Sequence, residues 1–399
     1  MAEFHKKVLS NGLTILYEHR NLPVTTIVVA AKYGYGYENS LNKGISHLIE
    51  HCIFKGTKKR TNEQLAASLE KVGGYVNAFT DEEETAIYTK IPSKHFELGL
   101  DVILDMFLNP AFDDKEIKKE KKVVLEEMKM YHDSPMRSIF DIMKSLLYKP
   151  PFSISGLGTE KCLNIIKRKD LLKLHLDQYT PKNTILIVIG DVSLEDVAEK
   201  AEKYFDLYRV QGYKNIDVRF SNGNYTEKRK GIDQAHLALG FHAPPFSNKL
   251  NYAAQLANSL LAPGHSSILW REIREKRGLA YALLSILECG KNFGYHTFYV
   301  GCPKENVNQV FEIIKKEIKE LQNIKQKNLS EMKEQLIGNH LLKMEDSTTV
   351  AKELLYYEIA GKAEDFYNYE ENISAVKLDD VKSVMNVKDY SKALILPEK

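Results

Sequence analysis

The sequence predicts an α+β protein with two similar domains in tandem, each a mostly antiparallel sheet packed with helices. Strand-like and helix-like patterns follow one another in the same order in both halves, which indicates a duplicated unit. The 399 residues are also too many for one ordinary hydrophobic core. A polar segment separates the halves, so we expect an N-terminal domain over 1–210, a linker over 211–224 and a C-terminal domain over 225–399.

The composition favours a globular protein and argues against nucleic-acid or membrane-surface partners. Apolar residues make up 43% of the chain, and the formal net charge is only +2. No stretch approaches the length of a membrane span, and the first residues lack an apolar signal segment. The four cysteines are scattered without a Cys-x-x-Cys pair, which is typical of reduced thiols. We therefore expect a soluble cytoplasmic protein.

The first elements are predicted as strands. Asn11-Gly12 lies between two apolar runs, which predicts a hairpin over residues 8–18. Residues 24–31 are β-branched and almost continuously apolar, as expected for a buried central strand. An amphipathic pattern over residues 62–72 predicts a helix that ends at Gly73-Gly74.

A short helical run between these elements carries the strongest chemical signal, His-x-x-Glu-His. Residues three and four apart share one face of a helix, so His47 and His51 direct their imidazoles to one point, and Glu50 can reach it. Two neutral imidazoles and a nearby carboxylate suit a zinc ion with one position left for water. Because so short a pattern also arises by chance on a solvated helix, the rest of the chain must supply a third ligand.

The helix predicted over residues 114–132 contains the candidate third ligand. Glu126 has lysines three and four residues away, which is the usual pattern of a solvated face. Glu127 lies among apolar residues, namely Val123, Val124, Met130 and Tyr131. A carboxylate in an apolar stripe is costly unless it is paired or bound to metal, so we choose Glu127 as the ligand. Glu120, two turns earlier on the same side, is a supporting carboxylate. Periodicity alone allows a buried salt bridge equally well.

Two further segments have open interpretations. Residues 75–80 and 85–88 predict paired strands around an acidic turn, either an ordinary hairpin or an edge that receives an extended peptide. In residues 264–281 a Gly/Ser loop runs into a basic helix end and then a strand. Spacing alone favours a solvated charge for Arg274 and a packing role for Tyr281.

The remaining elements alternate in both halves. In the first half we expect helices over 94–109, 135–147, 163–179 and 194–205, and a strand over 183–192. In the second half we expect strands over 235–241, 282–288 and 293–301, and helices over 252–261 and 307–322. The second half has no His-x-x-Glu-His, and we expect structural or surface roles for its histidines: His236, His242, His265, His296 and His340.

Four stretches in one order resemble the pitrilysin-type (M16) zinc metallopeptidases. They are GISHLIEHCIFKGTKKR, GGYVNAFTDEEETAIY, NPAFDDKEIKKEKKVVLEEMKMYHDSP and REIREKRGLAY. The likeness spans nearly the whole chain, and it is closest to the two-domain subunits of the mitochondrial processing peptidase and their bacterial relatives.

This resemblance implies a zinc endopeptidase and a role for each matching residue. One zinc ion per subunit would be held by His47, His51 and Glu127, with Glu50 as the general base and Glu120 as the supporting acidic residue. The strand at Asn77, Ala78 and Phe79 would receive the peptide substrate. Arg274 and Tyr281 would contact the scissile carbonyl region in the site of a second subunit. The resemblance thus implies a homodimer in which each subunit completes the other's site inside a closed chamber.

Two departures and one alternative accompany the resemblance. Cys52 stands where the family usually has Met or another apolar residue, and its direction on the helix indicates packing. The segment LLAPGHSSILW lacks the fuller glycine run of many members, which leaves a glycine-loop role in substrate capture unsupported.

The alternative function is a non-catalytic partner or structural subunit, although such members typically lose a ligand or the base. A metal-dependent nuclease or phosphatase would need carboxylate clusters and a basic surface that the chain lacks.

Overall fold

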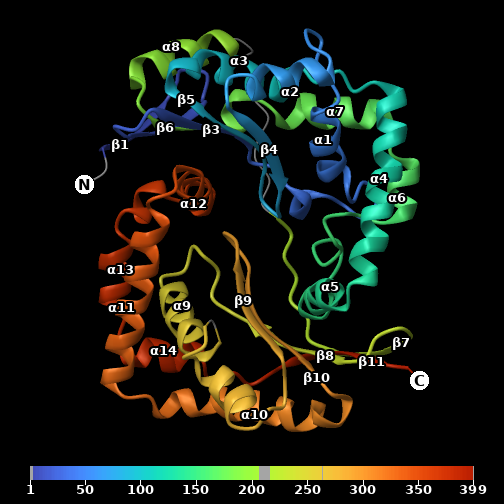
Figure 1. Ribbon diagram of the computed structural model, residues 1–399, viewed down its shortest axis with the longest axis vertical. Helices are drawn as coiled ribbons and strands as arrows, with labels where there is room; N and C mark the ends of the chain where they lie inside the picture. The colour runs from blue at the N-terminus through green and yellow to red at the C-terminus, as the bar shows by residue number, and fades with distance from the viewer. Residues whose placement is uncertain (1–2, 206–215, 263, 399) are drawn as a thin grey trace. The chain divides into compact units, whose positions relative to one another are not determined.

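The computed structural model describes residues 3–205, 216–262 and 264–398, which form two compact units (Figure 1). One unit consists of Met1–Glu127, Ser155–Asp217 and Lys343–Phe366, and the other of Met128–Ile154, Val218–Leu342 and Tyr367–Lys399. Each unit contains one sheet with helices, which confirms the predicted α+β class. The division of the sequence at 211–224 stays a prediction, and residues 211–215 of the expected linker lie outside the described residues.

The first unit contains a six-stranded sheet in the order β1-β2-β6-β3-β5-β4. Its strands are β1 (Glu3–Val8), β2 (Thr14–His19), β3 (Val24–Ala31), β4 (Tyr75–Thr80), β5 (Thr85–Pro92) and β6 (Thr184–Gly190). β2 and β6 run parallel and the other neighbours antiparallel. The hairpin at Asn11-Gly12 is confirmed, with Gly12 at φ 89°. β3 lies between β6 and β5 with almost all its residues buried, as predicted.

Helices cover this sheet on both sides, with α3 and α8 on one side and α12 on the other (Figure 1). The unit contains α1 (Ile45–Ile53), α2 (Asn62–Glu70), α3 (Phe96–Leu108), α6 (Glu160–Ile165), α7 (Arg168–Gln178), α8 (Leu194–Tyr204), α12 (Ser347–Ala360) and most of α4 (Asp114–Asp133). The prediction of a single helix over 163–179 is wrong, because two helices, α6 and α7, cover this range. The chain leaves helical geometry at Ile166, and α7 begins anew with the Asp170 carboxylate accepting from the Lys167 backbone N–H.

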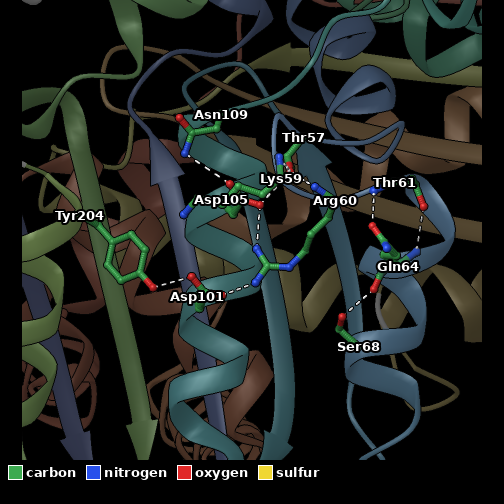
Figure 2. Close-up of polar contacts among 10 residues, drawn as sticks. All are labelled: Thr57, Lys59, Arg60, Thr61, Gln64, Ser68, Asp101, Asp105, Asn109 and Tyr204. Carbon is green, nitrogen blue, oxygen red and sulfur yellow. Dashed lines mark hydrogen bonds and ion pairs between the residues drawn. The ribbon is translucent and has the colours of Figure 1, made fainter.

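A partly buried polar network joins the loop after α1 to α3 and α8 (Figure 2). Thr57 Oγ1 and Arg60 Nη1 each donate to Asp105 Oδ2 at 2.7 Å. Arg60 also pairs with Asp101, whose other oxygen accepts from the Tyr204 hydroxyl at 2.6 Å. Because the Asp105 carboxylate is fully buried, these donors satisfy a group that would otherwise destabilise the fold. The network therefore fixes the point where the chain leaves α1.

The second unit contains a five-stranded sheet in the order β7-β11-β8-β10-β9. Its strands are β7 (Asn224–Arg229), β8 (Ala235–His242), β9 (Ala282–Cys289), β10 (Gly294–Cys302) and β11 (Ser391–Pro397). β8, β9 and β10 occupy the predicted positions. β7 was not predicted, because this edge strand is polar and largely exposed, so its residues lack the alternation of a half-buried strand.

The helices of the second unit are α5 (Pro135–Leu147), α9 (Leu250–Leu261), α10 (Val307–Glu320), α13 (Tyr369–Ala375), α14 (Leu378–Val384) and nearly all of α11 (Gln326–Lys343), with a π-helical segment, η4, at Trp270–Glu275. α5 packs on β8, β10 and β11, although it comes from the first half of the sequence. Short 3-10 turns occur at Tyr35–Tyr37, Ser93–His95, Pro181–Asn183, Lys304–Asn306, Leu321–Asn323 and Ala363–Phe366. Among the described helices, none is long and apolar enough to cross a membrane.

Candidate metal centre and active site

Helix α1 presents the His-x-x-Glu-His residues because its other face is buried. Ile45, Leu48, Ile49, Cys52 and Ile53 form the apolar face of this helix. The two histidines and Glu50 lie on the half-buried opposite side. Cys52 is a packing residue as expected, and burial raises the pKa of its thiol to about 12.

The structure brings His47, His51 and Glu127 together, with one possible ligand atom of each within 4.8 Å of the others. Glu127 Oε2 lies 3.7 Å from His47 Nε2 and 3.5 Å from His51 Nε2. Two ligands of a tetrahedral zinc ion, each bonded at about 2.0–2.1 Å, lie about 3.4 Å apart. The donor types and their separations therefore fit zinc.

Helix α4 brings Glu127 to the histidines through its buried stripe. Ile117, Glu120 and Val124 are the buried residues of α4, and Glu127 continues the stripe one turn further. Glu127 was predicted as a ligand because it lies among apolar residues, and the structure supports that reason only in part. Val124 is buried, but Val123 and Met130 are 48% and 51% exposed, so the position is less apolar than expected.

Glu120 orients His51 from the side away from the ligand atoms. Its Oε2 lies 3.0 Å from His51 Nδ1, and its Oε1 lies 3.0 Å from Lys55 Nζ. An N–H at Nδ1 that donates to this buried carboxylate leaves the Nε2 lone pair of His51 for a metal. Glu120 therefore acts through His51 and is not part of the ligand cluster. By contrast, Nδ1 of His47 is buried without a hydrogen-bond partner among the described residues.

The two histidines differ in proton affinity. Burial, together with the charge of His51, lowers the pKa of His47 to about 4. Burial also lowers the pKa of His51, but hydrogen bonds to Glu127 and Glu120 outweigh it, so the pKa of His51 is raised. At neutral pH His47 is therefore neutral before any metal binds, whereas the raised pKa of His51 makes protons stronger competitors with a metal at that residue.

Glu50 lies beside the cluster but outside it. Its Oε2 accepts a hydrogen bond of 2.6 Å from the Thr80 hydroxyl at the end of β4. Burial raises the pKa of Glu50, and the Thr80 hydrogen bond opposes that rise. Thr80 was not predicted as a site residue, although it directly follows Phe79 in the candidate substrate strand.

A second missed group caps the N-terminus of α1. Glu38 accepts from the backbone N–H groups of Gly44 and Ser46, both at 2.7 Å. A carboxylate here satisfies free N–H groups and matches the helix dipole. Lys43 is fully buried, donates to the Tyr35 carbonyl at 2.6 Å and interacts with Glu38. Burial raises the pKa of Glu38 to about 7 against the opposing charge of Lys43.

Strand β4 is the last strand of its sheet, so the expected edge is present (Figure 1). Asn77, Ala78 and Phe79 pair with β5 on one side, and no strand pairs with the other side among the described residues. Asn77 Oδ1 accepts from the Ala78 backbone N–H at 2.8 Å. The predicted contact of this edge with a substrate stays a prediction.

Arg274 and Tyr281 lie together in the second unit. The guanidinium carbon of Arg274 is 5.1 Å from the centroid of the Tyr281 ring, and Arg274 Nη1 donates to the Tyr281 carbonyl at 3.3 Å. The Tyr281 side chain is 76% exposed, so it is a surface group and not the packing residue that spacing alone favours. The Tyr281 side chain is therefore open to a ligand, and Arg274 beside it is half-buried.

Comparisons with known proteins agree with this fold and give the family. The family description "Insulinase (Peptidase family M16)" matches residues 14–160, and "Peptidase M16 inactive domain" matches residues 166–336. The matched part described as inactive contains no His-x-x-Glu-His.

Relatives in bacteria extend over nearly the whole chain. "Uncharacterized zinc protease YmxG" of Bacillus subtilis (strain 168) is 32% identical over 397 residues, 97% of this chain and 97% of that protein. An "Uncharacterized zinc protease" of Rickettsia felis is 31% identical and covers 96% of this chain, which in turn covers 94% of that protein.

Solved structures share the fold. A protease from Helicobacter pylori has a TM-score of 0.91 at 23% identity, with all of both chains covered. A structure from Pseudomonas fluorescens, titled "peptidase M16 inactive domain", has a TM-score of 0.90 at 17% identity and covers this chain fully, with 98% of its own length matched. The family descriptions on both halves and the relatives that span the full length confirm the resemblance: the chain belongs to peptidase family M16.

Proposed function

We propose that this protein is a zinc-dependent endopeptidase that hydrolyses peptides or unfolded, extended polypeptide segments. One observation carries the proposal: His47, His51 and Glu127 converge as a three-ligand set, and the carboxylate of Glu50 lies beside that set without belonging to it. Catalytic zinc sites have this composition, with three protein ligands and a separate general base. The zinc proteases among the relatives support both the metal and the reaction class.

The chemistry divides between the metal and the residues around it. His47, His51 and Glu127 would hold the zinc ion, which when bound supplies a Lewis acid for the scissile carbonyl and lowers the pKa of water. Glu50 takes a proton from the attacking water and passes it to the leaving amine. Its raised pKa brings the carboxyl closer to neutral pH, where one group can both accept and return a proton. Thr80 holds the Glu50 carboxylate in one orientation.

The substrate would bind as an added strand. The side of β4 that pairs with no other described strand offers main-chain hydrogen bonds to an extended segment at Asn77, Ala78 and Phe79. β4 ends at Thr80, which contacts Glu50, so a peptide bond on this edge comes close to the general base. Recognition through main-chain hydrogen bonds favours unfolded substrates and depends little on their amino-acid sequence.

The proposed assembly is a homodimer. Arg274 and Tyr281 of each subunit complete the site of the other inside a shared chamber and stabilise the oxyanion of the tetrahedral intermediate. Loss of one such donor typically lowers kcat by about 10²–10³-fold. The four cysteines are free and buried, which supports a reducing location such as the cytoplasm.

The alternative is a non-catalytic partner or structural subunit of an M16-type complex. The match of residues 166–336 to a family model described as an inactive domain favours it, because that part of the sequence contains no His-x-x-Glu-His. The complete set of His47, Glu50, His51 and Glu127 argues against it.

One experiment separates the two functions. The purified protein is stripped with a chelator, reloaded with zinc and incubated with a library of unstructured peptides, and products are identified by mass spectrometry. We expect cleavage that depends on one equivalent of zinc per subunit. Stoichiometric zinc binding without turnover of any peptide would contradict the endopeptidase and favour the non-catalytic subunit.

A further inference from the structure

The guanidinium of Arg274 lies over two aromatic rings. Its central carbon is 4.2 Å from the centroid of the Trp270 ring and 5.1 Å from that of Tyr281. Both distances are within the range of cation–π attraction. Trp270 belongs to the same π-helical segment as Arg274, whereas Tyr281 immediately precedes β9, so the two rings approach from different elements.

The position of the indole is itself fixed. Trp270 Nε1 donates to Glu275 Oε1 at 3.1 Å, and the ring of His265 packs edge-on against it at 4.4 Å. Trp270 is also half-buried, whereas the Tyr281 side chain is mostly exposed. Of the two rings around Arg274, the indole is therefore the less exposed one, and two further contacts hold it in place.

The neighbouring cations have a different environment. Lys276 and Arg277 contact the Glu272 carboxylate at 2.6 and 2.7 Å, and Arg271 lies 3.7 Å from it. Arg274 has no ion pair with a carboxylate within the part of the chain that the structure describes. A carboxylate partner would compensate its charge, whereas ring faces and a carbonyl orient the guanidinium and leave the charge available.

We propose that Trp270 is a positioning residue that holds Arg274 beside Tyr281 with its charge uncompensated, ready for the electron-rich oxygen of a peptide carbonyl. This role rests on the proposed endopeptidase function and adds a residue that neither the sequence motifs nor the family likeness assigned. Arginine otherwise samples many rotamers, so an orienting ring reduces the ordering that the reaction itself must supply.

The test measures kcat and KM of the zinc-loaded, full-length enzyme on an unstructured fluorogenic peptide. Trp270→Leu removes the ring, and we expect kcat to fall by about 3- to 30-fold, the range of a cation–π contact, with KM little changed. Trp270→Phe keeps a ring face and should recover most of the loss. Arg271→Ala is the matched control, because it removes a neighbouring charge that faces Glu272 and should leave kcat unchanged.

A double-mutant cycle separates positioning from a general effect on folding. In an Arg274→Ala background, Trp270→Leu should cause no further loss, because the indole then has nothing to orient. An equal loss in both backgrounds, or wild-type kcat in Trp270→Leu, would overturn the proposal.

A second readout does not depend on turnover. Trp270 is the one tryptophan in the sequence, so its emission reports the contact directly. We expect Arg274→Ala to change the emission spectrum of the folded protein and Arg271→Ala to leave it unchanged. Unchanged emission in Arg274→Ala would refute the contact. If the emission changes as expected but zinc-loaded wild-type protein cleaves nothing, the endopeptidase function fails, and the catalytic role of the contact fails with it.

Discussion

Replacement of Glu120 gives a quantitative test of how the metal centre is organised. This carboxylate contacts His51 Nδ1 at 3.0 Å and Lys55 Nζ at 3.0 Å, and it is not one of the three clustered ligands. Residues that orient a ligating histidine typically contribute 10- to 100-fold to metal affinity. We therefore expect Glu120→Ala to weaken zinc binding by that factor, or by about 1.4–2.7 kcal/mol.

The order within a short series tests the cause. Glu120→Gln keeps an oxygen that can accept from His51 but loses its charge, so its zinc affinity should lie between those of wild type and Glu120→Ala. Glu116→Gln is the matched control, because it removes a carboxylate one turn earlier on α4 that pairs with Lys119 and not with a histidine. Zinc dissociation constants are measured by competition with a chelator, and the circular dichroism spectrum of each metal-free variant checks that it is folded. A Glu120→Ala protein that binds zinc as tightly as Glu116→Gln would refute the reasoning.

Three further predictions concern the groups around α1 and the assembly. Burial raises the folded-state pKa of Glu38 from 4.5 to about 7, so its contribution to stability is complete below pH 4.5 and is lost as pH rises through 7. In chelator, the free energy of unfolding of wild type relative to Glu38→Gln should therefore fall by roughly 2–3 kcal/mol between pH 5 and 8, and an unchanged difference would contradict this account. Thr80→Val removes a hydrogen bond that lowers the pKa of Glu50, so that pKa should rise and the acidic limb of the pH profile of kcat/KM should move to higher pH. An acidic limb at the wild-type position would show that this hydrogen bond does not set the pKa of the general base. Mixed Glu50→Gln and Arg274→Ala subunits should recover activity that neither has alone, and stable mixed dimers without activity would argue against a site completed across two chains.

Local patterns account for the parts of the fold that the sequence predicted correctly. The Asn11-Gly12 hairpin, the apolar strand β3 and the helix α1 each depend on residues close together in the chain. Where the structure differs from the prediction, the element depends on contacts between residues far apart in the sequence, or its local sequence pattern is weak. β7 is polar and exposed on one edge, and a break at Ile166 ends α6 without a proline or glycine. α5 lies in the first half of the sequence but belongs to the second unit, and α12 lies in the second half but belongs to the first unit. Both placements depend on packing against strands far away in the sequence.

The same distinction holds for the candidate site. The spacing of His47, Glu50 and His51 on one helix is a local property and could be predicted. Glu120 and Glu127 share one stripe of α4, which periodicity predicts, but their distances to the histidines depend on how α4 packs. Thr80 reaches Glu50 only through a tertiary contact, and Glu38 caps α1 from a loop that has no recognisable capping pattern in the sequence.

The turnover of a zinc-loaded Glu50→Gln protein tests the central claim most directly. Glu50 lies outside the ligand cluster, so this variant should bind one equivalent of zinc per subunit, as the wild type is expected to do. Because the amide of glutamine cannot accept the proton of the attacking water, cleavage of an unstructured peptide should be lost. Full zinc occupancy without cleavage is the predicted result, and wild-type cleavage by this variant would contradict the account.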